Sequence, residues 1–215
     1  IVRVGDRAKN GHWYAVFGSG PTGPIDTTYN QFKGQSNQSL KFFIVDLRTG
    51  ILVDTIDTGI ENAFAGSMLG ASIDADRWDS SSNGHYQDDA IYVGYTKKNS
   101  VTGTWTDGGV IRIMTKETST VTNWTWSEVI GDTGPIVTSI SRLQDRKNKN
   151  LWLYFGSGRY YYHAGSEIDD NDGQRRIYGI KEPCYNTTAH PGNLLDKTCT
   201  ATVTSGVTDQ SNSIS

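Results

Sequence analysis

Apolar residues in this chain come in short runs that end at glycine, and one such run occurs twice. Residues 13–20 read Trp-Tyr-Ala-Val-Phe-Gly-Ser-Gly, and residues 152–158 read Trp-Leu-Tyr-Phe-Gly-Ser-Gly. A weaker copy, Ile-Tyr-Val-Gly-Tyr, occupies residues 91–95. After each copy and a polar loop comes a second apolar run, at residues 42–45, 110–113 and 177–180. Repetition of this kind predicts an architecture of repeated β-sheets.

The apolar runs have the period of strands. Residues 41–56 predict two strands joined by a tight turn at residues 48–50, where Gly50 supplies the positive φ that a hairpin turn needs. Within residues 123–129 polar and aromatic side chains alternate between two faces. The best candidate helix, residues 60–69, is short and interrupted by glycine. We therefore expect an all-β chain.

The predicted strands group into three units, which we expect to be about three four-stranded blades of a larger β-propeller. The first unit lacks its first strand, the second is complete, and the third lacks its last strand. Since a propeller closes with at least four blades, the chain is expected to be part of a longer protein. Residues 1–182 form the propeller part, and residues 183–215, rich in Thr, Ser and Asn, read as a loop or linker. The strands of the second and third units are expected at residues 67–73, 90–95, 109–115, 123–129, 135–143, 151–155 and 176–180.

Composition supports many short strands and argues against two classes of partner. The chain has 24 Gly, eleven Tyr, six Trp and six Phe, a mixture typical of strands joined by turns. Its net charge is −3, with a dense basic stretch only at residues 142–149, so nucleic acid is not an expected partner. No apolar stretch approaches the roughly 20 residues that a membrane-spanning helix needs.

Two cysteines, Cys184 and Cys199, flank a loop rich in Thr and Asn. A disulfide between them would add about 3 kcal/mol of stability in the chain-entropy estimate. The alternative is a pair of unpaired thiols. We favour the disulfide, because a polar loop without a core of its own gains most from a cross-link, and a disulfide indicates an exported protein.

An acidic loop precedes the copy of the repeated run that lacks serine. Asp74 and Asp76 alternate, Asn83 precedes a glycine, and Asp89 adjoins the predicted strand. Calcium takes six to eight oxygen ligands, and alternating carboxylates in a glycine-bent loop can surround one ion. An insertion at residues 78–82 interrupts the compact form of this pattern. The alternatives are a calcium site and an acidic, solvated turn.

Other candidate sites have structural explanations that we favour. The acidic residues 167–173 predict a charged loop tip rather than a metal site. The four histidines lack zinc spacing. Gly-Ser-Gly at residues 18–20 and 156–158 is shorter than a nucleophile elbow, and its repetition indicates a structural turn. The aromatic residues 160–163 either pack over a blade edge, which we favour, or face a carbohydrate.

Taken in order, these segments resemble the C-terminal β-propeller of the PilY1 family, large type IV pilus-associated proteins of Gram-negative bacteria. The resemblance covers about residues 10–182 and is carried by residues 13–20 with 42–50, by residues 70–94 and by residues 135–180. It implies a modified seven-bladed, quinoprotein-like propeller at the cell surface or outside the cell. It further implies a non-catalytic role in pilus biogenesis, adhesion and twitching motility, with pilins and host or abiotic surfaces as partners.

The resemblance also implies a calcium loop between the first two strands of a blade, whose occupancy tunes pilus extension and retraction. By position, its ligands are Asp74, Asp76, Asn83 and Asp89, with a backbone carbonyl near residues 85–86.

Two other classes of protein rank below this one. Quinoprotein dehydrogenases use large propellers with aromatic repeats and a calcium ion beside pyrroloquinoline quinone. Their sites typically carry adjacent cysteines, whereas Cys184 and Cys199 are not adjacent. A surface propeller that binds polysaccharide through residues 160–163 ranks third.

Overall fold

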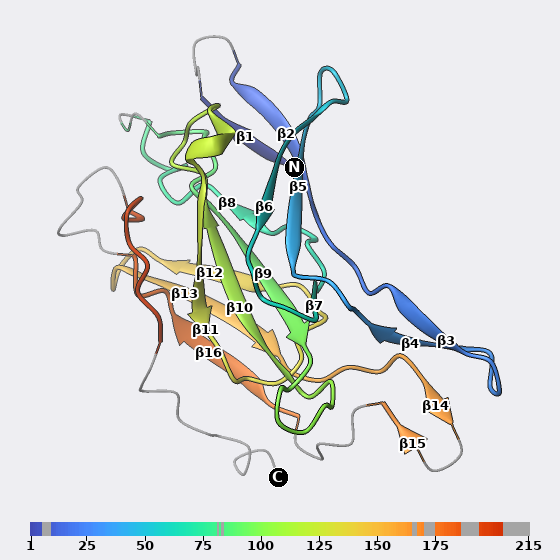
Figure 1. The fold of residues 1–215 in the computed structure, drawn as a ribbon. Helices are drawn as coiled ribbons and strands as arrows, with labels where there is room; N and C mark the ends of the chain where they lie inside the picture. Colours follow the sequence, from blue (N-terminus) through green and yellow to red (C-terminus); the bar gives the residue numbers. More distant parts are fainter. Residues whose placement is uncertain are drawn as a thin grey trace.

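The computed structural model describes residues 1–5, 10–80, 82, 84–164, 167–169, 175–185 and 194–203. Within these residues the chain is all-β, and its one helical element is a short 3-10 turn, η2 (Val121–Asn123). No described helix is long and apolar enough to cross a membrane. The strands form three antiparallel sheets and two short hairpins (Figure 1).

Sheet 1 has four strands in sequential order, so the expectation that this unit lacks its first strand is wrong. The first strand of this sheet is β1, which the sequence did not predict and which pairs with β2. It is only three residues long, too short for its alternation to be recognised, yet Val2 and Val4 are buried in the core. The predicted hairpin at residues 41–56 is confirmed as β5 and β6. The strands are β1 (Val2–Val4), β2 (His12–Gly18), β5 (Lys41–Asp46) and β6 (Leu52–Asp57).

Sheet 2 has a divided first strand where one continuous strand was expected at residues 67–73. Two short strands, β7 and β8, pair with opposite ends of β9. Two glycines lie between them. A Cβ on Gly66 would lie only 2.5 Å from the Ile136 carbonyl oxygen, and Gly70 has a φ of +62°. The chain therefore bends here. The strands are β7 (Ala63–Ala65), β8 (Ser72–Ile73), β9 (Ala90–Lys97), β10 (Asp107–Met114) and β11 (Thr125–Ile130).

Sheet 3 has three described strands, β12 (Ser141–Asp145), β13 (Asn150–Gly156) and β16 (Ile177–Lys181). Its first strand begins later than the expected residue 135. Ile136 instead forms an isolated bridge to Gly158.

The middle sheet lies between sheets 1 and 3, and its two central strands, β9 and β10, are buried on both faces (Figure 1). Along β10, Ile111 and Ile113 join the core shared with sheet 1, while Val110 and Met114 join the core shared with sheet 3. Period-two alternation thus assigns successive side chains of one strand to two different cores. The three sheets form a stack of layers.

The two copies of Gly-Ser-Gly have the same structural role. Ser19 and Ser157 each follow the second strand of a sheet, and their hydroxyls accept the backbone N–H of Lys41 and Arg176, both at 3.0 Å. The backbone N–H of each serine donates to the carbonyl of the same partner at 2.8 Å. These bonds join the second strand to the start of the next strand in the sheet, so the repeated phrase is a structural turn.

Each outer sheet carries an inserted hairpin after its second strand, and the two hairpins meet. Sheet 1 contributes β3 (Gly23–Asp26) and β4 (Gln31–Gln35), and sheet 3 contributes β14 (His163–Ala164) and β15 (Glu167–Ile168). They lie side by side in Figure 1. The Gln31 side-chain amide exchanges two hydrogen bonds with the backbone of His163, at 2.8 and 2.7 Å.

Arg159 fastens the two insertions together, and we call this contact the clasp. Its buried guanidinium pairs with Asp169 at 2.8 Å and donates to the Lys33 carbonyl at 2.8 Å. The same group lies 4.9 Å from the ring of Tyr161. The Asp169 carboxylate is therefore used in a buried ion pair, which corrects the expectation of a charged loop tip for this residue. Residues 170–173 of the expected tip lie outside the described residues. Packing within residues 160–163 is confirmed for Tyr161, whereas Tyr160 is exposed.

The predicted disulfide between Cys184 and Cys199 is confirmed. Next to it, buried Glu182 accepts the Cys184 N–H at 2.8 Å and pairs with Arg112, a fully buried residue of β10. Arg112 also donates to the Ala201 carbonyl at 3.2 Å. The disulfide loop is thereby fixed to the middle sheet.

Replacing Glu182 with Gln would leave the Arg112 charge buried without an anion. We expect the Glu182→Gln variant to lose about 3–5 kcal/mol of unfolding free energy in urea denaturation, as is typical when one partner of a buried pair is removed. The exposed Glu61 provides a matched control, and Glu61→Gln should change stability by less than about 0.5 kcal/mol. Equal stability of the two variants would contradict the structural role of this pair.

Candidate metal centre

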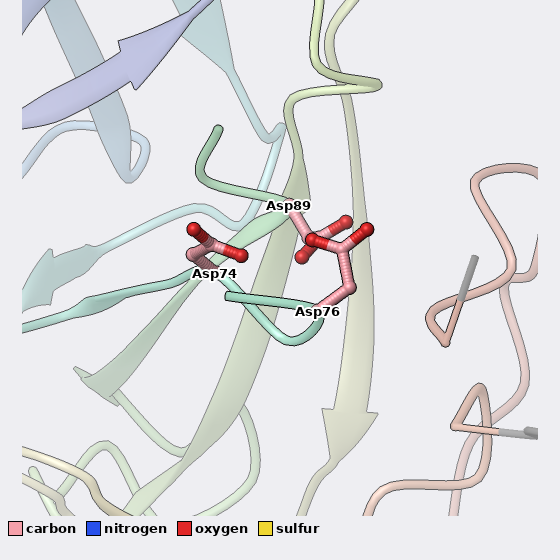
Figure 2. Close-up of side chains that lie close together, drawn as sticks. All are labelled: Asp74, Asp76 and Asp89. Carbon is pink, nitrogen blue, oxygen red and sulfur yellow. The ribbon is translucent and has the colours of Figure 1, made fainter. Parts of the chain in front are cut away.

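Three of the predicted carboxylates come together at one end of the middle sheet. Asp74 directly follows β8, Asp76 lies in the turn after it, and Asp89 directly precedes β9. One oxygen from each lies within 4.8 Å of the others (Figure 2). Asp76 and Asp89 are buried, with 2% and 4% of their surfaces exposed, and Asp74 is half-buried.

Backbone hydrogen bonds around the cluster explain why the loop adopts this form. The Asp89 N–H donates to the Ile73 carbonyl at 2.7 Å, and the Ala75 N–H donates to the Asp89 carboxylate at 2.7 Å. The Arg3 N–H of β1 donates to the Asp88 carboxylate at 2.8 Å, and the Asp88 N–H donates to the Arg3 carbonyl at 2.7 Å. The loop is thus attached both to its own sheet and to sheet 1.

Two oxygens in the cluster have no hydrogen-bond donor among the described residues. These are Oδ1 of Asp74 and Oδ1 of Asp76, and both are shielded from solvent. The other oxygen of Asp76 accepts the Ser82 hydroxyl. Buried acceptors without a partner are rare and unfavourable. A cation bound between these oxygens would satisfy both.

Burial and the neighbouring acidic groups raise the pKa values of Asp74 and Asp89. Burial, followed by the hydrogen bond to Asp76 and its charge, raises the pKa of Asp74 to about 8. Burial raises the pKa of Asp89 well above its usual value, and the charges of Glu117 and Asp76 add to this effect. Without a cation the cluster holds protons that an ion would displace.

Glu117 adds a fourth carboxylate that the sequence did not indicate. It follows β10, and its side chain is hydrogen-bonded to Asp89. A Cβ at Gly84 would lie 2.4 Å from its Oε1 and 2.8 Å from Oδ2 of Asp76, so glycine allows the two carboxylates to approach here. Lys197, in the disulfide loop, pairs with Glu117 at 2.8 Å. No local motif could reveal Glu117, because the β9–β10 pairing brings it to the loop.

An all-oxygen ligand set of this kind fits a hard cation such as Ca²⁺ better than zinc. Within the described part of the chain, this is the one group of three or more His, Cys, Asp or Glu side chains close enough to hold a metal. Asn83, the fourth expected ligand, lies outside the described residues. The backbone of Tyr86, where a carbonyl ligand was expected, is hydrogen-bonded to Asp74.

Comparisons of this chain with family models, curated proteins and solved structures give no match.

The raised pKa of Asp74 predicts the pH dependence of metal-free stability. The neutral carboxyl is favoured in the folded state, so this contribution is full below about pH 4, the unfolded pKa, and is lost as pH rises through about 8. In EDTA, we expect the unfolding free energy to fall over this range more steeply for wild type than for Asp74→Asn.

The control for this experiment is Asp54→Asn, on β6, which should keep the wild-type slope in urea denaturation at several pH values. Parallel curves for wild type and Asp74→Asn would show that Asp74 ionises normally.

Proposed function

We propose that this chain is a set of consecutive blades from a larger β-propeller and works at the cell surface as a non-catalytic, calcium-binding protein. The single observation that carries the proposal is the buried carboxylate cluster with two oxygens lacking donors. The resemblance to pilus-associated proteins supplies the biological setting: calcium-tuned pilus extension and retraction, and adhesion with pilins and host or abiotic surfaces as partners.

The stacked sheets support the propeller reading. Each of the three follows sequential antiparallel order, and the inner faces pack through two apolar cores. The outer faces of sheets 1 and 3 also carry large apolar side chains. Trp13 and Phe17 of sheet 1 are 42% and 56% exposed, and Leu143 of sheet 3 is 55% exposed. Exposed apolar sheet faces suit further packing by sheets of the same type.

The disulfide supports placement outside the cytoplasm, since such bonds persist in oxidising compartments. It also counts against the quinoprotein alternative, in which adjacent cysteines face the cofactor. Cys184 and Cys199 instead join two separate segments beside the core between sheets 2 and 3.

Calcium titration by calorimetry tests the proposed function. We expect wild type to bind one Ca²⁺ with a dissociation constant of roughly 10⁻⁷ to 10⁻³ M, the range that sensors and extracellular modules together span. Asp74→Ala and Asp76→Asn should each weaken binding at least about tenfold, because the first removes an oxygen that lacks a donor and the second removes the negative charge of its carboxylate.

The matched control is Asp54→Asn, an acidic residue of β6 outside the cluster, which should bind calcium as wild type does. Absence of heat in wild type, or equal binding by Asp74→Ala, would overturn the proposal. Thermal melts with and without calcium separate loss of binding from loss of folding, since a ligand of the native state raises the melting temperature.

A further inference from the structure

A polar groove lies at the other end of the middle sheet from the carboxylates. Asp89 directly precedes β9 and Lys97 ends it, so at about 3.3 Å per residue the two positions are roughly 25 Å apart. Two hollows of about 350 and 700 Å³ share Asn62 and Lys98 in their walls. The two hollows therefore adjoin, and we call them together the amide groove. Its other lining residues include Thr22, Gln35, Asn37 and Trp105.

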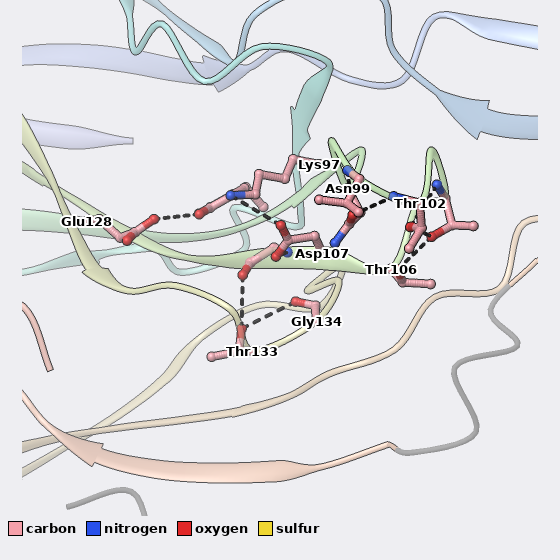
Figure 3. Close-up of polar contacts among 12 residues, drawn as sticks. Lys97, Asn99, Thr102, Thr106, Asp107, Glu128, Thr133 and Gly134 are labelled. Atoms are coloured by element: carbon pink, nitrogen blue, oxygen red, sulfur yellow. Dashed lines mark hydrogen bonds and ion pairs between the residues drawn. The ribbon is translucent and has the colours of Figure 1, made fainter. Parts of the chain in front are cut away.

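The wall formed by the β9–β10 loop is held by its own hydrogen bonds (Figure 3). The Asn99 side chain accepts the N–H groups of Val101 and Thr102, both at 2.9 Å. Lys97 and Asp107 form an ion pair at 3.2 Å. These contacts fix the backbone of the loop, so the wall is preorganised for a ligand.

Three polar side chains in the lining of the groove are available. Among the described residues, the side-chain amides of Gln35 and Asn62 and the ammonium of Lys98 contact no hydrogen-bond or ion-pair partner. Asn37 has only a 3.5 Å contact with the Thr22 hydroxyl. An amide both donates and accepts, so each can bind two hydroxyl groups of a ligand.

We propose that the amide groove binds a saccharide chain, with a carboxylate-bearing sugar unit at Lys98. Ligand sites occupy roughly 300–1,000 Å³, and the two hollows fall in that range. The polar lining suits a hydroxyl-rich ligand, and adjoining hollows suit consecutive units of a chain. Lys98 lies where the hollows meet, and Lys97 is already paired with Asp107. The smaller hollow has Lys98 and no carboxylate in its lining, whereas Glu61 lines the larger one, so the acidic unit belongs in the smaller hollow.

This inference goes beyond the proposed calcium binding and does not depend on it. The groove uses none of the cluster's residues and lies at the opposite end of β9. It also differs in location from residues 160–163, where Tyr161 is used in the clasp.

Titration with a galacturonate hexamer and its methyl ester, in EDTA, tests the proposal. The two oligosaccharides have the same shape and differ in charge. We expect the acid form to bind in the millimolar range or tighter and the ester to bind about fivefold more weakly, the scale of one exposed ion pair. Lys98→Gln should reduce the affinity for the acid to that for the ester.

A second variant tests whether the side-chain amide of Asn62 contacts the saccharide. Asn62 has a φ of +48°, so Asn62→Gly removes its side chain while keeping a backbone conformation that glycine adopts freely. This variant should weaken binding of both oligosaccharides several-fold. The control is Lys181→Gln on sheet 3, which should bind both as wild type does.

Failure of both oligosaccharides to bind wild type would overturn the proposal, as would equal affinities of wild type, Lys98→Gln and Asn62→Gly. Loss of binding in Tyr160→Ala alone would place the saccharide on the exposed part of residues 160–163 and also overturn it. None of these outcomes bears on calcium binding, because the titrations are made in EDTA.

Discussion

Burial of both faces of the β9–β10 pair is the constraint on which the rest of the structure depends. No side chain in the centre of these strands can reach water, so each must fit one of two apolar cores. Where neighbouring backbone comes too close, only glycine fits. A Cβ on Gly94 would lie 2.3 Å from the Ile136 side chain, and one on Gly109 would lie 2.3 Å from the Ile130 carbonyl. Arg112 satisfies the same constraint by pairing with Glu182.

The same constraint determines where chemistry can occur. Loops at the two ends of the buried strands are the places where polar groups from sheet 2 can gather, and the two ends differ in character. The end before β9 brings Asp74, Asp76 and Asp89 together under partial burial, which makes their negative charges unfavourable without a cation. The end after β9 is open and carries amides and one unpaired lysine among its described residues.

The sequence was a good guide wherever local pattern decides the structure. Alternation and the repeated phrase predicted the second and third strands of every sheet, and the spacing and setting of Cys184 and Cys199 predicted their bond. Features set by distant contacts could not be predicted. The strand β1 is too short to show a period, and Glu117 reaches the acidic cluster only through strand pairing.

The acidic cluster itself was predicted in part. Asp74, Asp76 and Asp89 meet as expected, because Ile73 of β8 pairs with Ala90 of β9 and so brings the two ends of the loop together. The divided first strand of sheet 2 depends on glycines at points of backbone contact, and a single sequence does not show which glycines have that role.

The clasp has a consequence for the order of folding. Its bond from Arg159 to the Lys33 carbonyl joins residues 126 positions apart, and the two partners belong to insertions from different outer sheets. Closing so long a loop is slow unless intervening structure has already shortened it. We therefore expect the three sheets to stack before Arg159 enters its aromatic surroundings. In that order of events the clasp closes late, after the sheets have brought the two insertions together.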